Sequence, residues 1–419
     1  MLDARTEPEG VSHMTTTDPT VAIFTISNFE AAKEVYRQKD LRQALYDEGE
    51  VVMGDVLVNL HGDEHRKRRR VENRIFRRET FDHYERDLFP QVTAVTVAPY
   101  VTAGGVDLVQ LGHELMLNLA ALTAGIDRPE GTAEETRRLY DYMQWFIKGA
   151  TLAHSTEDKP ALAARIQQAL EEWDEEFLKP SVARRKTALA ALEAGQITED
   201  DLPKDILTTL LRGNDELGLP AFALRREIAF FLLASAHTSA TAFVRSIDHI
   251  LGWLADHPED AERVVGDPMF VQRCVHETVR LNPSSPVGMR WALAPVSLKS
   301  GTEIPQGSKV VIDLHAVNRD PDVFGPDAAE FNPYRELPAG VGPFGLSFAA
   351  GIHVCIGQDL AAGVVPRADT TPDEHLFGLV PGAVRYMFNQ GVRRDPANPP
   401  QRDAQTQRPY WGTYPALLG

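Results

Sequence analysis

The 419-residue sequence is poor in cysteine, has no long apolar run and carries a deficit of positive charge. Its two cysteines, Cys274 and Cys355, cannot build a disulfide framework, which favours a reducing compartment. The most apolar stretch, residues 228–236, is far shorter than the ~20 residues that cross a membrane. Lys and Arg number 43 against 60 Asp and Glu, a net charge of −17, which argues against binding to nucleic acid or to an anionic membrane. These absences predict a soluble cytoplasmic protein.

Two common kinds of cofactor site are also missing. Two distant cysteines and scattered histidines do not supply the closely spaced ligands of a zinc site. There is no Gly-x-Gly-x-x-Gly sequence and no phosphate loop, so we expect nicotinamide and flavin to belong to separate proteins. What is present, 43% hydrophobic and 25% charged residues, is the composition of a globular protein. The length fits two ordinary domains or one large enzyme domain.

The chain divides into a polar start, a helical part and an irregular part. We predict that residues 1–20 are a disordered leader and that residues 21–419 form one domain. Apolar spacing near 3.6 residues predicts helices over residues 28–39, 63–76, 108–123, 132–154, 161–176, 221–256 and 268–281. The pattern at 221–256 would span roughly 50 Å, and its middle is apolar on nearly every face, which predicts a buried central helix. Alternation in residues 297–312 predicts short β-hairpins.

The irregular part, residues 318–351, is rich in Pro, Gly and Asp, and long irregular stretches inside compact domains are usually functional. It ends in a loop around Cys355. In this loop Gly351 permits a tight turn, and Gly357 permits the close approach of a flat ligand. Residues 356–362 read as a helix, whose free N–H groups would favour a thiolate at Cys355. A lone cysteine is more often a small buried hydrophobe, so the loop alone leaves both interpretations open.

The cysteine loop resembles the haem-binding loop of the bacterial cytochrome P-450 family, Phe-Gly-x-Gly-x-His-x-Cys-x-Gly. The residues that match this pattern are Phe348, Gly351, His353, Cys355 and Gly357, while Ala349 replaces the first Gly. The resemblance implies a mainly α fold with small antiparallel β-sheets, in which a single large domain encloses one haem b (iron protoporphyrin IX). It also implies that Cys355 binds the iron as a thiolate, a ligand that favours O–O cleavage.

Further motifs follow in the family's order. Residues 277–280 resemble its Glu-x-x-Arg, and residues 316–321 and 331–335 resemble segments that follow it. The resemblance implies that Glu277, Arg280 and Arg335 form a buried ion network that holds the irregular segment. Loss of one member would strand a buried charge at a cost of about 3–5 kcal/mol.

The haem propionates would need cationic or hydrogen-bonding partners. His65 and Arg69 supply the family's His-x-x-x-Arg, one helical turn apart and on one face. By resemblance, the residues that bind the cofactor are His65, Arg69, Arg290, Phe348, His353 and Gly357.

Eight Lys and Arg residues crowd residues 65–78. Three interpretations are open: a solvated helix face, a nucleic-acid patch, which the overall acidity disfavours, or a docking surface for an acidic ferredoxin. By resemblance we favour docking of a ferredoxin near Arg66, Lys67 and Arg70, with a ferredoxin reductase behind it.

The central helix departs from the family's Ala/Gly-Gly-x-Asp/Glu-Thr-Thr/Ser pattern. Thr238 keeps the alcohol that would hydrogen-bond dioxygen and guide protons, but Ser235 replaces a Gly and His237 replaces the acid. Histidine can relay protons near neutral pH, so we predict that Thr238 and His237 are catalytic. His237 could instead contact the substrate, direct a different reaction or be a core residue.

We expect a monooxygenase that inserts one oxygen atom from O2 into an apolar small molecule. The pocket should be lined by residues 51–60, Trp145, Phe146, the central helix and residues 284–288. The alternatives are a peroxide-driven or non-oxygenating haem-thiolate enzyme, prompted by His237, and a non-catalytic haem sensor. The resemblance is good over residues 21–360 and weaker beyond, where Pro366 interrupts an expected helix, a further helical piece follows near 374–389, and residues 410–414 suggest a hairpin.

Overall fold

The computed structural model describes residues 11–15, 21–152, 155, 157–367, 369–404 and 409–419. The helices are α1 (Phe29–Arg37), α2 (Glu50–Met53), α3 (Gly62–Glu72), α4 (Arg78–His83), α5 (Phe89–Ala103), α6 (Leu108–Ala124), α7 (Ala133–Ala150), α8 (Lys159–Trp173), α9 (Lys179–Glu193), α10 (Ile206–Arg212), α11 (Asn214–Leu217), α12 (Ala221–Asp256), α13 (Ala261–Gly266), α14 (Pro268–Leu281), α15 (Leu314–Val317), α16 (Pro321–Phe324), α17 (Gln358–Ala362) and α18 (Leu379–Asn389). The strands are β1 (Val11–Thr15), β2 (Ala22–Ile26), β3 (Leu41–Gln43), β4 (Gly105–Asp107), β5 (Val287–Ala292), β6 (Val296–Ser297), β7 (Glu303–Ile304), β8 (Lys309–Asp313), β9 (Arg393–Arg394), β10 (Gln401–Arg402), β11 (Trp411–Thr413) and β12 (Pro415–Leu417).

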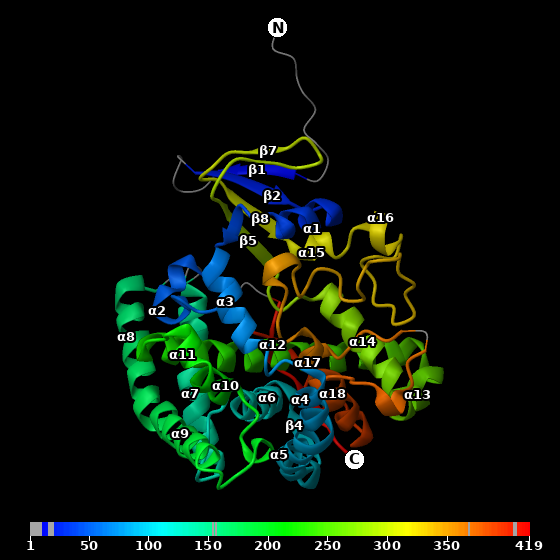
Figure 1. Ribbon diagram of the computed structural model, residues 1–419. Coiled ribbons are helices and arrows are strands. Elements are labelled where there is room, and N and C mark those ends of the chain that lie inside the picture. The colour runs from blue at the N-terminus through cyan, green and yellow to red at the C-terminus, as the bar shows by residue number, and fades with distance from the viewer. Residues whose placement is uncertain (1–10, 16–20, 153–154, 156, 368, 405–408) are drawn as a thin grey trace.

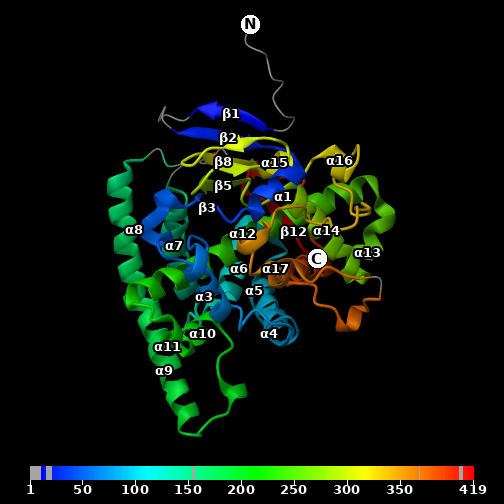
Figure 2. The ribbon, with the colours of Figure 1, turned by 45° about the horizontal axis from the view of Figure 1, so that its top comes forward.

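Helices form the bulk of the molecule, and the largest sheet lies at one end (Figure 1). Turning the view shows β1, β2, β8 and β5 side by side in that sheet, with α8 and α9 along one flank of the helical part (Figure 2). This arrangement confirms the predicted fold class, which is a single, mainly helical domain with small sheets.

The largest sheet has the strand order β1-β2-β8-β5-β3. It is mixed rather than purely antiparallel, because β2 and β8 run parallel. β3 pairs with β5 so that Gln43 lies opposite Arg290, a register that matters at the site below. The predicted leader contributes to this sheet, since Val11–Thr15 forms β1 and pairs with β2. Residues 1–10 and 16–20 lie outside the described residues.

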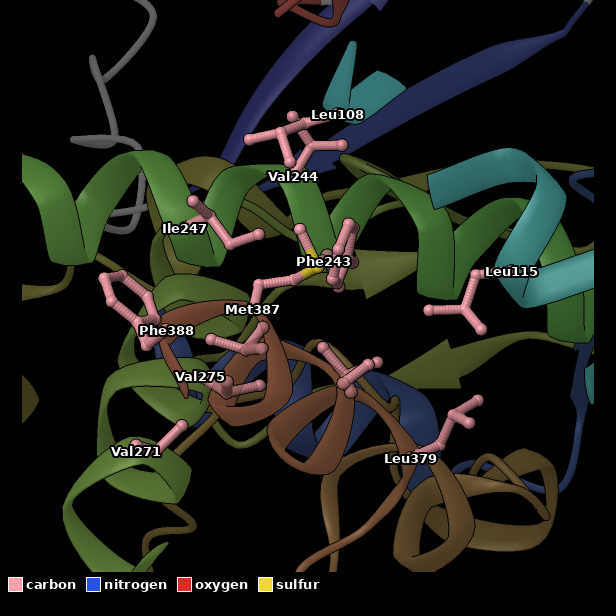
Figure 3. Packing of buried hydrophobic residues seen from close by; sticks show 14 of the residues in the cluster. Leu108, Leu115, Phe243, Val244, Ile247, Val271, Val275, Leu379, Met387 and Phe388 are labelled. Carbon is pink, nitrogen blue, oxygen red and sulfur yellow. The ribbon is translucent and has the colours of Figure 1, made fainter. Parts of the chain in front are cut away.

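The central helix has the predicted bounds. Its 36 residues span about 54 Å at 1.5 Å per residue. Phe243 and Ile247 are fully buried, and Figure 3 shows them between α6, which carries Leu115, and α18, which carries Met387. Packing on several sides explains the apolar pattern around the helix. By length and composition α12 could cross a membrane, but 67% of its most apolar window is buried inside the protein, as in a core helix.

Other helices follow their local signals. Asn28 caps α1 by accepting a hydrogen bond from the Ala31 N–H, and Asp267 caps α14 with Pro268 in its first turn. The predicted helix at 63–76 ends earlier, at Glu72. The predicted hairpins at 297–312 appear as the β6–β7 pair followed by β8.

The helix after Cys355 is interrupted, as predicted, but the break comes before Pro366, and the helical piece predicted near 374–389 begins only at Leu379. The chain between α17 and α18 forms a loop. α17 ends at Ala362, and Gly363 and Gly378 have positive φ angles of 79° and 90°. A Cβ on Gly378 would lie 2.2 Å from the Gly363 nitrogen, so the two ends of the loop cross at a point that only glycine permits. The Gln272 amide donates to the Ala362 and Val364 carbonyls at 3.1 Å and holds the crossing.

Candidate functional site

An internal cavity of about 330 Å³ lies where α3, α12, β5 and the cysteine loop meet. Most of its lining is apolar, with Leu57, Phe231, Ala242 and Val287 among the residues that form it. The cysteine loop supplies Phe348, His353, Cys355 and Gly357, α3 supplies His65 and Arg69, and β5 supplies Arg290. The structure therefore brings every predicted cofactor-binding residue to one cavity.

Backbone geometry holds the cysteine loop. The Cys355 N–H donates to the Phe348 carbonyl at 2.9 Å. Ala349 has a φ of 58°, so the residue that replaces the family's first Gly lies in the left-handed region that favours glycine. Gly351, at φ 72°, has no room for a side chain, because a Cβ would lie 2.4 Å from the Tyr36 carbonyl oxygen. A Cβ on Gly357, in contrast, would meet nothing within 4 Å, which leaves that wall of the cavity open to a flat ligand.

Cys355 is accessible from the cavity although it lies in the interior. Burial raises the pKa of its thiol, while the Gly357 N–H and the Arg69 guanidinium act in the opposite direction. Cys274 differs, because it is fully buried in the apolar core and burial raises the pKa of its thiol further than any partner lowers it. Of the two cysteines, Cys355 is therefore the one that can reach a ligand.

A basic cluster occupies one part of the cavity wall. Arg69 donates to the Val354 carbonyl at 2.8 Å, and Arg290 donates to the Gln43 side-chain oxygen at 2.7 Å. The rings of His65 and His353 lie 4.3 Å apart between centroids. Among the described residues, neither ring nitrogen of His65 has a hydrogen-bond partner, and Nε2 of His353 has none.

Burial lowers the pKa of His65 to about 4, with Arg69 as the next cause, and lowers the pKa of His353 to about 3, with His65 next. Both rings are therefore neutral at pH 7 and can donate one N–H each. Unpaired buried donors beside two guanidinium groups call for an anionic ligand with several acceptor oxygens. The two propionates of haem meet this requirement, and the open wall at Gly357 beside Cys355 suits its flat ring. The residues present fit haem.

On α12, Ser235 and Thr238 line the cavity. The Thr238 hydroxyl donates to the Ala234 carbonyl at 2.6 Å, one helical turn back. His237 is not among the described residues that line the cavity. Its ring lies on another face of α12, 6.1 Å from the His113 ring and 5.9 Å from the Tyr410 ring, measured between centroids.

The predicted pocket walls are found in part. Leu57 and Val58 from residues 51–60 line the cavity, as do residues 284, 285, 287 and 288. The prediction is wrong for Trp145 and Phe146. Phe146 is fully buried, 5.3 Å from the Trp173 ring, and Trp145 lies under the cations of Lys148 and Arg165. These two side chains face away from the cavity because α7 packs against α8.

Sequence reasoning missed residues of the basic cluster that come from distant segments. Gln43 faces Arg290 only because β3 pairs with β5, and Tyr36 lies under the Arg290 guanidinium, 4.8 Å from it. Burial raises the pKa of Tyr36 to about 12, so it stays neutral. No short motif marks either residue.

Two buried ionic clusters flank the site. In the Glu277 cluster (Glu277, Arg280 and Arg335), the carboxylate accepts from Arg280 Nε at 2.7 Å and from Arg335 Nε at 3.0 Å. This is the predicted ion network. The Glu72 cluster (Arg68, Glu72 and Glu227) was not predicted. In it Arg68 donates to Glu227, and no hydrogen bond reaches either carboxyl oxygen of Glu72 among the described residues.

The exposed face of α3 carries the predicted docking cations. Arg66, Lys67 and Arg70 are all exposed. Arg66 pairs with Asp63, and Arg70 lies 3.9 Å from Glu216, so part of their charge is locally balanced. The same helix presents His65 and Arg69 to the cavity, which places this surface one helix thickness from the site.

Comparison with known proteins agrees with this geometry. The family model described as "Cytochrome P450" matches residues 11–363. Pulcherriminic acid synthase of Bacillus subtilis is 27% identical over 346 residues, which cover 80% of this chain and 78% of that protein. Cyclooctat-9-en-7-ol 5-monooxygenase of Streptomyces melanosporofaciens is 26% identical over 373 residues, covering 78% of this chain and 75% of that protein.

Two solved structures share the fold. P450BioI, in complex with a hexadec-9Z-enoic acid-ligated acyl carrier protein, has a TM-score of 0.75 at 16% identity, covering 98% of this chain and 96% of that one. HmtT, involved in himastatin biosynthesis, has a TM-score of 0.74 at 19% identity, covering 99% and 96%.

Proposed function

Because the chain belongs to the cytochrome P450 family, whose members are haem b-dependent monooxygenases, we propose that it inserts one oxygen atom from O2 into a small organic molecule. The observation that carries this proposal is the shared cavity, in which the Cys355 thiol and the Thr238 alcohol line the same space. Of the two relatives, one is named a synthase and the other a monooxygenase, and the second name supports the same reaction class. The mostly apolar lining supports a substrate with apolar surface.

Bound haem supplies the redox chemistry that activates dioxygen. The chain's own residues would hold it: Cys355 through its thiolate, and His65, Arg69, Arg290 and His353 at the propionates. Phe348 and Gly357 line the cavity with Cys355 and would contact the haem. Thr238 would hold a proton at its Oγ1 for the reaction, because its hydroxyl lines the cavity and can turn away from the Ala234 carbonyl.

The role proposed for His237 is different from that of Thr238. Its ring contacts His113 and Tyr410, and it is not among the described residues that line the cavity. We propose that it positions this part of the helix, and that proton movement at the site depends on Thr238. His237→Phe should then keep product formation per electron consumed, whereas Thr238→Ala should divert the electrons to hydrogen peroxide.

The first test is the absorption spectrum of the dithionite-reduced protein under carbon monoxide. We expect a strongly red-shifted Soret band that is lost in Cys355→Ala. The matched control is Cys274→Ala, which removes the other cysteine and should keep the band. A band at the position typical of imidazole ligation, or no haem at all, would contradict the proposal.

We propose that electrons come from a ferredoxin and its reductase, and that the protein works in the cytoplasm. The exposed cations of α3 suit an acidic partner. Lys67→Glu should slow reduction by an acidic ferredoxin several-fold at low salt, and the difference should shrink at high salt. The control is Arg137→Glu, an exposed cation on α7. Equal slowing by both variants would place the docking surface elsewhere.

A further inference from the structure

Side-chain hydroxyls gather in one part of the otherwise apolar cavity. We define the hydroxyl wall as the cavity-lining residues Ser235, Thr238, Ser239, Ser284 and Ser285. Three of them come from α12, and the other two come from the segment between α14 and β5. The two segments touch, because the Ser284 hydroxyl donates to the Thr238 carbonyl at 3.1 Å. The two segments that form the wall are therefore in direct contact.

The hydrogen bonds within the wall determine what it offers to a ligand. The Thr238 hydroxyl donates to the Ala234 carbonyl at 2.6 Å, and the Ser285 hydroxyl donates to the Val287 carbonyl at 3.1 Å. The hydroxyl hydrogens of Thr238, Ser284 and Ser285 are therefore all engaged, and their oxygens can accept hydrogen bonds through the remaining lone pairs. Ser235 and Ser239 have no hydrogen-bond partner among the described residues, and both can donate.

The segment that carries Ser284 and Ser285 is fixed from both sides. Pro283 and Pro286 flank the two serines and restrict the backbone. Arg245 of α12 donates to the Asn282 carbonyl at 3.2 Å. The Tyr410 hydroxyl donates to the Ser284 carbonyl at 2.9 Å. The hydroxyls are therefore held in place before a ligand arrives, which reduces the entropy lost on binding.

We propose that the substrate carries a secondary amide, such as a lactam, and that the hydroxyl wall binds this group. The amide N–H donates to the acceptor hydroxyl of Ser285, and the amide carbonyl accepts from Ser235 and Ser239. The inference rests on the proposed function, because it names the substrate class of the same cavity. A purely apolar substrate would bury the two donors without partners, which is unfavourable. The rest of the cavity binds the apolar part of the molecule.

The test uses three ring compounds of similar size: ε-caprolactam, which has an N–H and a carbonyl, ε-caprolactone, which has the carbonyl alone, and cycloheptane, which has neither. Affinities are measured by calorimetry on the haem-loaded protein. Ser235→Ala should weaken the lactam and the lactone about fivefold and leave cycloheptane unchanged. Ser285→Ala should weaken the lactam by a similar factor and spare the lactone, which has no N–H to donate.

The control variant is Thr241→Ala. Thr241 is also on α12, but its hydroxyl donates to the His237 carbonyl at 3.0 Å and does not line the cavity. It should leave all three affinities unchanged. Equal relative affinities of the three probes in the wild type and in both serine variants would overturn the assignment. The carbon monoxide band, recorded on each sample, separates the two proposals: its absence contradicts the monooxygenase, whereas the calorimetric ratios decide the hydroxyl wall.

Discussion

The Glu277 cluster and the Glu72 cluster both bury ionisable groups, but they differ in whether each group has a hydrogen-bond partner of opposite charge. In the first, Arg280 is completely buried, yet each of its guanidinium nitrogens has an acceptor: Glu277 and the carbonyls of Asn318 and Ala328. Arg335 adds hydrogen bonds to Asp327 and to the Phe324 carbonyl. Every charge is balanced, and the donors hold the irregular segment to α14.

The Glu72 cluster holds two carboxyl groups but only one guanidinium group, that of Arg68. Glu227 is completely buried and accepts from Arg68 and from the Leu57 N–H at 3.0 Å. Glu72 is also completely buried, one helical turn after Arg68, but Arg68 donates to Glu227 instead. Burial, and then the neighbouring Glu227 charge, raise the pKa of Glu72 well above its usual range, so its carboxyl keeps its proton to a higher pH than in the unfolded chain. The comparison teaches that buried charge persists where the donors match it, and that surplus carboxyls take up protons where they do not.

The largest expected effect is in the Glu277 cluster. Arg280→Met removes the only side chain that contacts both oxygens of Glu277 among the described residues, and it leaves two carbonyls unpaired. We expect the free energy of unfolding to fall by about 3–5 kcal/mol. Urea denaturation measures it. A loss below about 1 kcal/mol would mean that this cluster is no better balanced than the other.

Arg68→Met should cost less and should depend on pH. It leaves Glu227 without its cation, but burial already raises the pKa of Glu227 to about 7, with Arg68 acting against this rise. Without Arg68, Glu227 can take up a proton, and the protein then no longer buries a charge that lacks a partner. We expect a loss of ~2–3 kcal/mol at pH 8 and a clearly smaller loss at pH 5. Urea denaturation at both values tests this, and an equal loss at both would rule out the proton uptake.

Glu72→Gln should stabilise the protein at alkaline pH. In the unfolded chain the carboxyl ionises near pH 4.5, and in the folded protein it ionises at a higher pH. Between the two pKa values the folded state binds the extra proton, so the stability of the wild type falls as pH rises. Glutamine does not ionise and avoids this loss, which is about 1.4 kcal/mol for each pH unit between the two pKa values.

Melting temperatures of the wild type and of Glu72→Gln between pH 5 and pH 8 check this expectation. The gain should grow with pH and vanish toward pH 4.5. A gain that stays constant with pH would show that Glu72 does not titrate in this range.

The smallest effect should come from a surface ion pair. Arg212 and Glu199 form two hydrogen bonds of 2.8 and 2.9 Å, a better geometry than several buried contacts, but both side chains are largely exposed. Arg212→Ala should change the free energy of unfolding by only about 0.5 kcal/mol, and salt should reduce the change further. A loss of unfolding free energy as large as that of Arg280→Met would contradict the expectation that loss of a buried ion pair costs more than loss of an exposed one.

Much of the fold could be predicted because its signals are local. The apolar patterns at 221–256 and 268–281 gave α12 and α14 with their observed bounds, since packing on all sides and a capping Asp267 leave marks in consecutive residues. The bounds were less reliable where a helix ends without such a mark. α3 stops at Glu72 rather than at 76, and the chain after it turns although its spacing remains helical.

The site was predicted only in part. The sequence by itself indicated the cysteine loop and the cavity residues His65, Arg69 and His353, because these belong to short motifs whose spacing reflects one turn or one helix face, whereas Arg290 was indicated only by the family resemblance. The tertiary structure alone decided the pairings across long separations. Arg290 meets Gln43, 247 residues away, and Arg68 meets Glu227, 159 residues away.

The orientation of the His237 side chain was also decided by the tertiary structure alone. A sequence gives the order of residues on α12, but not which side of that buried helix meets the cavity. The packing of α6, α14 and α18 around it sets this rotation (Figure 3), and so decides that Thr238 lines the cavity while its neighbour His237 faces His113 and Tyr410. A helix or a loop motif can be recognised from consecutive residues, because its signal is local. The orientation of a helix that is apolar on most sides depends instead on the sum of its contacts with distant segments.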